Sequence, residues 1–198
     1  MKLQEITAPS QEPLEKDELK LFMRLEKGYT DEDKLLDTMI KTARQKAETI
    51  LNRKLVRQEW KYWLDEWPDK DYITLPHALS TDSTTPVIKY YMTQSTEKTF
   101  GHSTYWRCDS VSVPGRLHLR YGEDWPSESL RDFNPIYVHY QSGFGLMSTN
   151  VPENIRLWMM RRINDWYENR ESWVVGQAVN AIPDRIDNLL SDDRIYHF

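Results

Sequence analysis

The chain has 198 residues, of which 39% are hydrophobic and 29% are charged, and its formal net charge is −5. This length suits one domain with a sizeable core, with room for a lobe set apart from it. The acidic balance argues against a general nucleic-acid binder, which normally shows a high pI or a basic patch.

The N-terminal quarter begins with polar sequence and then becomes helical. Residues 1–13 contain two prolines and are predicted to form an extended arm. Residues 14–27 have the spacing of a short helix, and Gly28 is expected to end it in a left-handed conformation. Residues 30–52 predict a long amphipathic helix, with Thr30 as its N-cap and acidic side chains in its first turn.

The middle of the chain changes to a strand pattern. Aromatic and apolar residues partly alternate over short runs between Pro- and Gly-marked turns, which favours a small antiparallel sheet or open barrel. The predicted strands cover residues 58–65, 72–76, 87–92, 105–113, 116–121 and 136–140. They predict an antiparallel β lobe whose strands lie within residues 56–142. The inserted segment that contains this lobe covers residues 56–149.

The C-terminal part returns to helical spacing. Residues 151–171 carry an apolar stripe, residues 183–190 predict a short helix, and residues 191–198 form a polar tail. The predicted fold class is therefore α+β. A helical bundle core, formed by residues 14–55 and 150–190, carries the β lobe as an insertion.

Residues that could carry catalysis or bind a metal are scattered. The five histidines show no metal-ligand spacing, although His118 and His139 could share a sheet face. Seven glycines form no phosphate-binding loop, and the single cysteine, Cys108, is expected to be a small apolar residue of a strand. The sequence therefore predicts no enzyme, no metal and no cofactor.

Two carbohydrate-related alternatives stay open. Four acids beside Trp-Pro pairs resemble a sugar-cleaving cleft, although the tryptophans are more simply loop anchors over the end of the sheet. These acids are Asp65, Glu66, Glu123 and Asp124. The other alternative is a non-catalytic sugar-binding face of exposed aromatic rings. The candidate rings are Trp60, Trp63 and Trp106.

The cellular compartment follows from segments that the sequence lacks. The start, Met1-Lys2-Leu3-Gln4-Glu5, has no apolar run of the kind that a signal peptide requires. No stretch approaches the roughly 20 apolar residues of a membrane span. We therefore expect a soluble protein, made in a reducing compartment and without a membrane partner.

An ordered set of short motifs follows the predicted helix Thr30–Leu51, and the pattern to which they belong covers roughly residues 14–194. The motifs are Asn52-Arg53-Lys54-Leu55, Gln58-x-Trp60, Leu64-Asp65-x-Trp67-Pro68, Ile73-x-Leu75-Pro76, Pro86-Val87, Pro114-Gly115-Arg116-Leu117, Trp125-Pro126, Val138-x-Tyr140-x-x-Gly143-Phe144, Val151-Pro152-x-x-Ile155 and Trp166-Tyr167-Glu168-Asn169-Arg170-Glu171. In this order they resemble the head–tail connector (adaptor) family of tailed bacteriophages and related gene-transfer particles. One departure is Asn52, because relatives commonly have a glycine before the arginine.

The resemblance implies a structural protein of the virion neck, located at the head–tail interface and assembled in the host cytoplasm. Such adaptors form a ring, usually dodecameric, that joins the portal protein to stopper or tail proteins. Genomic DNA passes through the ring without sequence-specific binding, and an acidic channel wall would repel its phosphates. The family has no catalytic residues to carry over. A stopper or a tail terminator is the nearest alternative role.

The C-terminal segment is the predicted portal-binding element. Residues 184–198 contain four acids and two arginines followed by two aromatic side chains, too polar to fold alone and aromatic enough to anchor. The candidate partner-binding residues are Arg185, Asp192, Asp193, Arg194, Tyr196 and Phe198. The arm at residues 1–13 is a second candidate for a subunit or partner contact.

Overall fold

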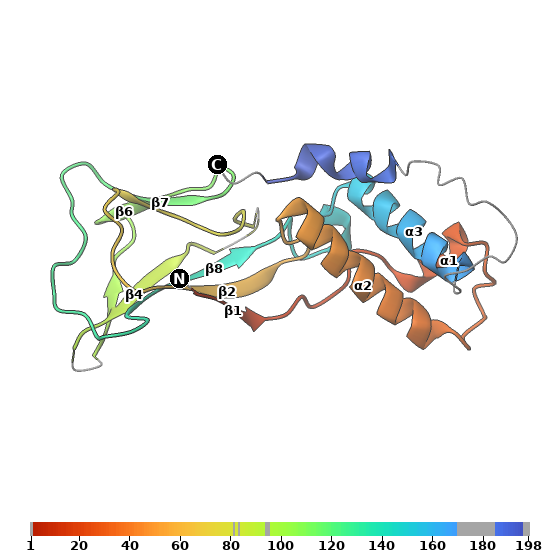
Figure 1. The fold of residues 1–198 in the computed structure, drawn as a ribbon, viewed down its shortest axis with the longest axis horizontal. Helices are drawn as coiled ribbons and strands as arrows, with labels where there is room; N and C mark the ends of the chain where they lie inside the picture. The colour runs from red at the N-terminus through yellow and green to blue at the C-terminus, as the bar shows by residue number, and fades with distance from the viewer. Residues whose placement is uncertain (1, 81, 83, 94–95, 170–184, 196–198) are drawn as a thin grey trace, which may run out of the picture. The chain divides into compact units, whose positions relative to one another are not determined.

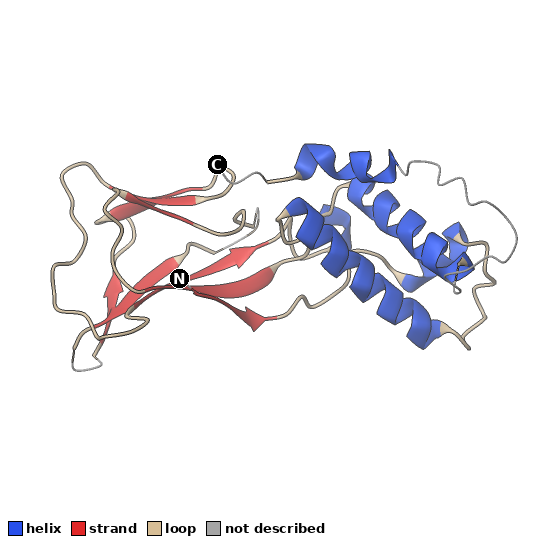
Figure 2. Cartoon of the chain, viewed as in Figure 1, coloured by secondary structure: helices blue, strands red, loops and turns tan. Residues whose placement is uncertain are grey.

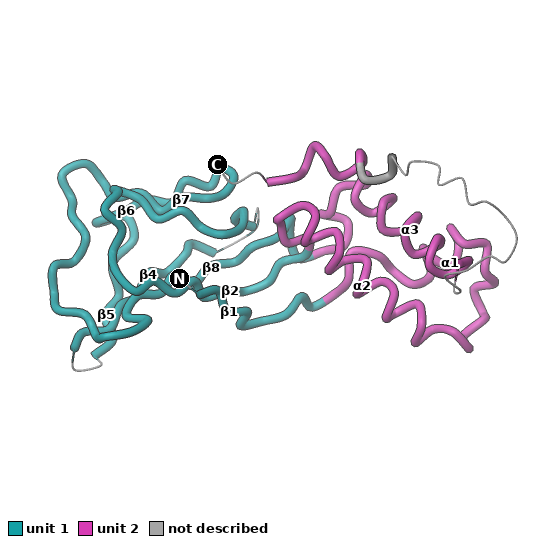
Figure 3. Tube along the Cα trace, viewed as in Figure 1, with its two compact units in different colours: residues 1–10, 56–146 teal, residues 11–55, 147–198 magenta. Residues whose placement is uncertain are grey.

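The structure, a computed structural model, describes residues 2–80, 82, 84–93, 96–169 and 185–195 (Figure 1). Helices and antiparallel sheets occupy different parts of the chain (Figure 2), which confirms the α+β class. Residues 1–10 and 56–146 make up one compact unit, the β unit, and residues 11–55 and 147–198 make up the helical unit (Figure 3). The roles of these units as adaptor core and inserted lobe stay predictions.

The helical unit is built on two long helices, α2 and α3, which pack against each other, with the 3-10 helix η2 against both (Figure 1). Its elements are α1 (Lys16–Phe22), α2 (Asp33–Leu51), η1 (Ser148–Asn150), α3 (Glu153–Glu168) and η2 (Arg185–Asp193). Buried residues at helical spacing line both long helices. They are Leu36, Ile40, Ala43, Ala47 and Leu51 on α2, and Ile155, Trp158, Met159 and Ile163 on α3.

The ends of three helices differ from the prediction. Helix α1 stops at Phe22, and Arg24, with φ of 59°, adopts the left-handed conformation that the sequence analysis assigned to Gly28. Helix α2 begins at Asp33 after Glu32, so Thr30 is not its N-cap. The predicted helix at 183–190 is a 3-10 helix that takes in the start of the predicted tail. Local sequence marks a helix but places its ends only loosely.

Asn52 ends α2 in a left-handed conformation, with φ of 51° and ψ of 31°. Its side-chain nitrogen donates a hydrogen bond to the backbone oxygen of Ile195, at 3.3 Å. Asparagine tolerates this conformation better than most residues, so it can occupy a position where glycine is the usual choice. The departure from the family pattern therefore leaves the helix exit intact.

We expect Asn52→Ala to lower the free energy of unfolding by about 2 kcal/mol, because the left-handed backbone conformation is unfavourable for alanine and the side-chain hydrogen bond is lost. Asn52→Gly keeps the backbone conformation and should cost about 1 kcal/mol or less. Urea unfolding of the two variants measures the difference. Equal losses for both would show that the backbone conformation is not the larger contribution.

The β unit contains two antiparallel sheets (Figure 2). The five-stranded sheet has the order β1-β2-β8-β4-β5, and the three-stranded sheet has the order β3-β7-β6. The strands are β1 (Lys2–Thr7), β2 (Gln58–Leu64), β3 (Tyr72–Thr74), β4 (Val87–Tyr91), β5 (Glu97–Phe100), β6 (Trp106–Asp109), β7 (Arg116–Leu119) and β8 (Ile136–Ser142). Among the described residues the strands thus form two sheets and not the single sheet or open barrel that was expected.

Two of these strands were not predicted. Strand β1 lies within the predicted arm and pairs with β2, with Lys2 opposite Trp63. Strand β5 pairs with β4. Both lie at the edges of the five-stranded sheet and carry mostly exposed polar side chains, so they lack the apolar alternation of a half-buried strand.

One hydrophobic core is shared by residues of both sheets, including Trp60 and Val138 of one sheet and Trp106 and Leu117 of the other. The rings of Trp67 and Trp125 stack at 5.1 Å between centroids with an interplanar angle of 9°, and both pack on this core. Aromatic side chains thus supply much of the buried area of the unit.

Candidate assembly and partner-binding surfaces

A buried arginine of α3, Arg156, connects this helix to α1 and to the segment before α1. One guanidinium nitrogen of Arg156 lies 2.6 and 2.7 Å from the two carboxylate oxygens of Glu18. A second nitrogen donates to Glu153, at 2.6 Å, and the third donates to the backbone oxygen of Pro13, at 3.3 Å. These bonds position α1 relative to α3.

A second set of ion pairs connects α1 to α2. The ammonium of Lys20, on a side chain only 4% exposed, lies 2.6 Å from Asp33 and donates to the backbone oxygen of Tyr29. Lys16 contacts both Asp33 and Asp37. The lysine contacts lower the pKa of Asp33, although burial opposes this effect. The acidic first turn of α2 is therefore engaged within the chain.

The C-terminal segment is held on the helical unit at its described end. The backbone N–H of Ile195 donates to the carbonyl oxygen of Leu51, at 2.9 Å, and the Ile195 side chain is buried. Farther back, the side-chain nitrogen of Asn154 donates to Leu189 and to Asp193, at 2.8 Å each. These contacts hold residues 185–195 on the helical unit, although the C-terminal segment was predicted to be too polar to fold alone.

The structure separates the predicted partner-binding residues into groups. Asp192 and Arg194 are exposed, whereas Asp193 is half-buried and bonded to Asn154. Arg185 begins η2, and its side chain lies outside the described part of the chain. Tyr196 and Phe198 also lie outside the described residues. The structure therefore assigns Asp193 and Ile195 to holding the segment in place.

An exposed apolar surface lies near the end of α1 and was missed by the sequence analysis. Leu21 is 80% exposed, and Phe22 and Tyr29 are about 40% exposed. Exposed apolar side chains of neighbouring sequence are typical of contacts between proteins. The signal was present in the sequence as adjacent leucine and phenylalanine residues within the predicted helix at 14–27.

The tryptophans proposed for a sugar-binding face are unsuited to it. Trp60 is 7% exposed and Trp106 is fully buried, so neither ring is accessible to a glycan. Trp63 packs on Tyr137 and donates its ring N–H to Gln4. This alternative is therefore wrong for Trp60 and Trp106, and the ring of Trp63 is half-buried.

The acids proposed for a sugar-cleaving cleft are not brought together in one, because Glu123 and Asp124 line a hollow beside Trp125 that Asp65 and Glu66 do not line. All four are exposed, whereas an acid catalyst of this type needs a desolvated carboxyl group. They are Asp65, Glu66, Glu123 and Asp124. The adjacent tryptophans instead stack on each other over the core, as loop anchors do.

The remaining sequence candidates also lie apart. His118 is in β7 and His139 is in β8, which belong to different sheets, so the shared face is wrong. Within the described residues, no group of three His, Cys, Asp or Glu side chains is placed to hold a metal ion.

Cys108 is a half-buried residue of β6, and burial raises the pKa of its thiol. None of the helices in the described ranges has the length and apolar character of a membrane span.

Glu97 attaches the edge strand β5 to its neighbours. It accepts hydrogen bonds from Lys89, at 2.7 Å, and from the hydroxyls of Tyr91 and Tyr137, at 2.8 Å each. These bonds, that of Lys89 first, lower the pKa of Glu97 from 4.5 to about 2. Ionised Glu97 therefore stabilises the sheet.

Because the pKa of Glu97 is lower in the folded chain, its contribution is present above pH 4.5 and is lost as the pH falls towards about 2. We expect Glu97→Gln to lower the free energy of unfolding at pH 7 by about 1 kcal/mol, a figure reduced for solvent screening. The variant should also show a weaker pH dependence between these two values. Urea unfolding over this range measures both effects, and an unchanged pH dependence would contradict the assignment.

Neither protein-family models nor curated proteins give a match to this sequence. Solved structures do. A chain in the neck of an empty gene transfer agent particle, computed with C6 symmetry, gives a TM-score of 0.74 at 22% identity, over 100% of this chain and 97% of that chain. A chain in the virion of the native particle gives 0.74 at 20% identity, with the same coverage.

A third similar structure is a chain in the neck of the native particle, computed with C12 symmetry. It gives a TM-score of 0.69 at 19% identity, again over 100% of this chain and 97% of that chain. At these identities the likeness shows a shared fold, and the coverage shows that the fold is shared over the whole length of both chains.

Proposed function

We propose that this protein is a structural, non-enzymatic component of the neck of a phage-like particle. The observation that carries the proposal is the fold likeness over the full chain to three chains of gene transfer agent particles, two of them from necks.

Within the neck, the proposed role is that of an adaptor. Copies of the chain form a dodecameric ring that binds the portal protein on one side and stopper or tail proteins on the other. The support for a ring is the C6 and C12 symmetry with which the similar necks were computed. Genomic DNA passes through the channel, and the protein resides in the virion neck after assembly in the host cytoplasm.

Electron microscopy of the purified protein, alone and mixed with its portal ring, tests this role. We expect a collar with twelvefold symmetry on the portal. A sixfold collar would keep the adaptor role and overturn the subunit number. Binding to tail proteins without portal contact would favour a stopper or tail terminator, and monomers that ignore both partners would overturn the neck assignment.

The C-terminal segment is the proposed portal contact, through Asp192, Arg194 and the residues that follow Ile195. Deletion of residues 191–198 would also remove the buried Ile195 side chain, so it confounds folding with binding. The sharper variant is Asp192→Asn combined with Arg194→Gln, which keeps Ile195 and the net charge. A pull-down on the portal should lose the double variant and retain Lys41→Gln, a change at an exposed α2 position. Retention of both variants would exclude these two side chains from the contact.

A further inference from the structure

The outer face of the three-stranded sheet carries an unusual set of side chains for an acidic protein. Ile73 of β3 and Leu117 of β7 are buried and point into the core. Because side chains alternate along a strand, their neighbours Tyr72, Arg116 and His118 lie on the opposite, outer face. On β6 the same alternation places Trp106 in the core and Arg107 outside.

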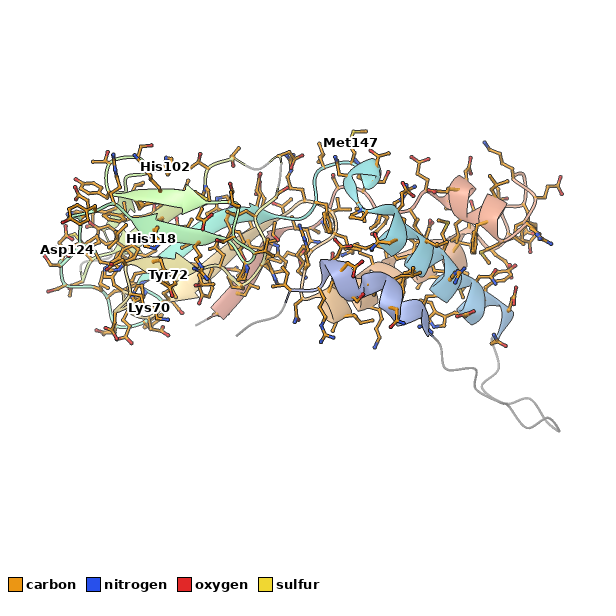
Figure 4. All side chains as sticks on the ribbon, turned by 90° about the horizontal axis from the view of Figure 1, so that it is seen from above. Lys70, Tyr72, His102, His118, Asp124 and Met147 are labelled. Carbon is orange, nitrogen blue, oxygen red and sulfur yellow. The ribbon has the colours of Figure 1, made fainter. Side chains whose placement is uncertain are left out.

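Tyr72 stands at the centre of this face. The Nζ atom of Lys70 lies 5.4 Å from the centroid of the Tyr72 ring, and the guanidinium carbon of Arg116 lies 5.2 Å from it. The ring of His118, directly opposite in the strand pairing, lies at 5.3 Å. Figure 4 shows Lys70, Tyr72 and His118 close together in the β unit. Arg107 is the exposed partner of His118 on the next strand.

The positive charges on this face are only partly neutralised within the described chain, because Asp109 lies opposite Arg116 and interacts with it electrostatically. No carboxylate of the described residues lies within ion-pair distance of Lys70, Arg107 or Arg116. Asp109 is opposite Arg116, but its oxygens accept bonds from the backbone of Val111 and from the backbone and hydroxyl of Ser112. The face therefore retains local positive charge, although the chain as a whole carries −5.

We propose that this basic face, formed by Lys70, Tyr72, Arg107, Arg116 and His118, binds the phosphate backbone of DNA. Guanidinium groups present forked donors that match phosphate oxygens. Lys70, Arg107 and Arg116 come from three separate segments that the strand pairing brings onto one face, so the face presents several cations to neighbouring phosphates. None of these five residues is aliphatic, so they lack the apolar centre of a typical protein contact, which favours DNA over an acidic protein surface.

This inference rests on the proposed function only for the presence of DNA at the neck. Contacts to phosphates alone carry no sequence information, so binding is weak, independent of sequence and sensitive to salt. The acidic net charge was expected to suit a channel wall that repels phosphates. The basic face instead provides one local contact for DNA, in a protein that otherwise repels it.

Fluorescence anisotropy with a short labelled duplex tests the proposal on the full chain. The test variant is Arg107→Gln/Arg116→Gln, and the matched control is Lys41→Gln/Lys46→Gln, which removes the same charge from exposed positions of α2. Over about 50 to 200 mM NaCl, the control should bind within about twofold of the native chain. The test variant should bind at least about tenfold more weakly, with a salt slope smaller by about two.

Three outcomes would overturn the proposal. Equal binding by both variants would show that the face is not used, and equal losses would show that only net charge matters. Polyaspartate that displaces DNA at equal charge concentration would assign the face to an acidic protein. Electron microscopy of the test variant with the portal tests collar formation separately, so that the DNA-binding proposal and the adaptor role can fail independently. A native chain that forms the collar without binding DNA overturns only this inference, and one that binds DNA without forming a collar overturns only the adaptor role.

Discussion

Replacing Gly143 by alanine is expected to destabilise the β unit by about 4 kcal/mol, the largest effect of any single substitution considered for this chain. Gly143 follows β8 with φ of 133°, a conformation that residues with a side chain rarely adopt. A Cβ atom there would lie 2.6 Å from the carbonyl carbon of Val56 and 2.7 Å from the nitrogen of Arg57. Both are backbone atoms, so no rotamer change can relieve the clash.

Substitutions at two other glycines allow the cost of backbone strain and the cost of the steric clash to be measured separately. Gly122 has φ of 82° but open space for a Cβ, so Gly122→Ala tests backbone strain alone and should cost about 1–2 kcal/mol. At Gly28 neither a positive φ nor a described heavy atom within 4 Å opposes a side chain, so Gly28→Ala should change stability by less than about 0.5 kcal/mol. Urea unfolding followed by tryptophan fluorescence measures all three. A Gly143→Ala loss no larger than that of Gly122→Ala would remove the clash from the explanation.

Arg156→Met is expected to lower the free energy of unfolding by about 3 kcal/mol. The arginine is 9% exposed, and its removal would leave the Glu18 carboxylate and the Pro13 carbonyl without their donor. Breaking a fully buried pair costs about 3–5 kcal/mol, and the lower end applies because the Glu18 side chain is 34% exposed. Methionine retains an apolar stem, so the loss reports on the polar contacts.

The matched control for this prediction is Arg161→Met, on the same helix and at an exposed position, which should change stability by less than about 0.5 kcal/mol. A double-mutant cycle with Glu18→Gln isolates the pair, since the double variant should lose less than the sum of the single losses. Strict additivity would mean that Arg156 and Glu18 do not stabilise each other, despite the 2.6 Å contact between them.

The elements that the sequence predicted well are those with a complete local pattern. Helices α2 and α3 carry apolar residues at helical spacing over most of their length, and β2 alternates buried and half-buried residues from end to end. Such periodicities need no knowledge of the partner surface, because one face of each element is simply apolar. The α+β class followed from them, whereas the resemblance to the adaptor family came from the ordered set of motifs.

The candidate surfaces were predicted less well. Asp192 and Arg194 are exposed as expected, but Asp193 and Ile195 hold the C-terminal segment on the helical unit. The basic face was missed because Lys70, Arg107 and Arg116 lie on three separate segments of the chain, and only strand pairing brings them together. A count of charges along the sequence shows none of this.

The sequence by itself determined the helices, most of the strands and the fold class, because each depends on the pattern of neighbouring residues. The tertiary structure alone decided that residues 2–7 join the five-stranded sheet, that the strands divide into two sheets, and that Arg156 meets Glu18 across 138 positions of chain. It also decided that Ile195 caps the end of α2. These features depend on contacts between distant segments, whose free energy comes from pairing and burial that no local pattern encodes.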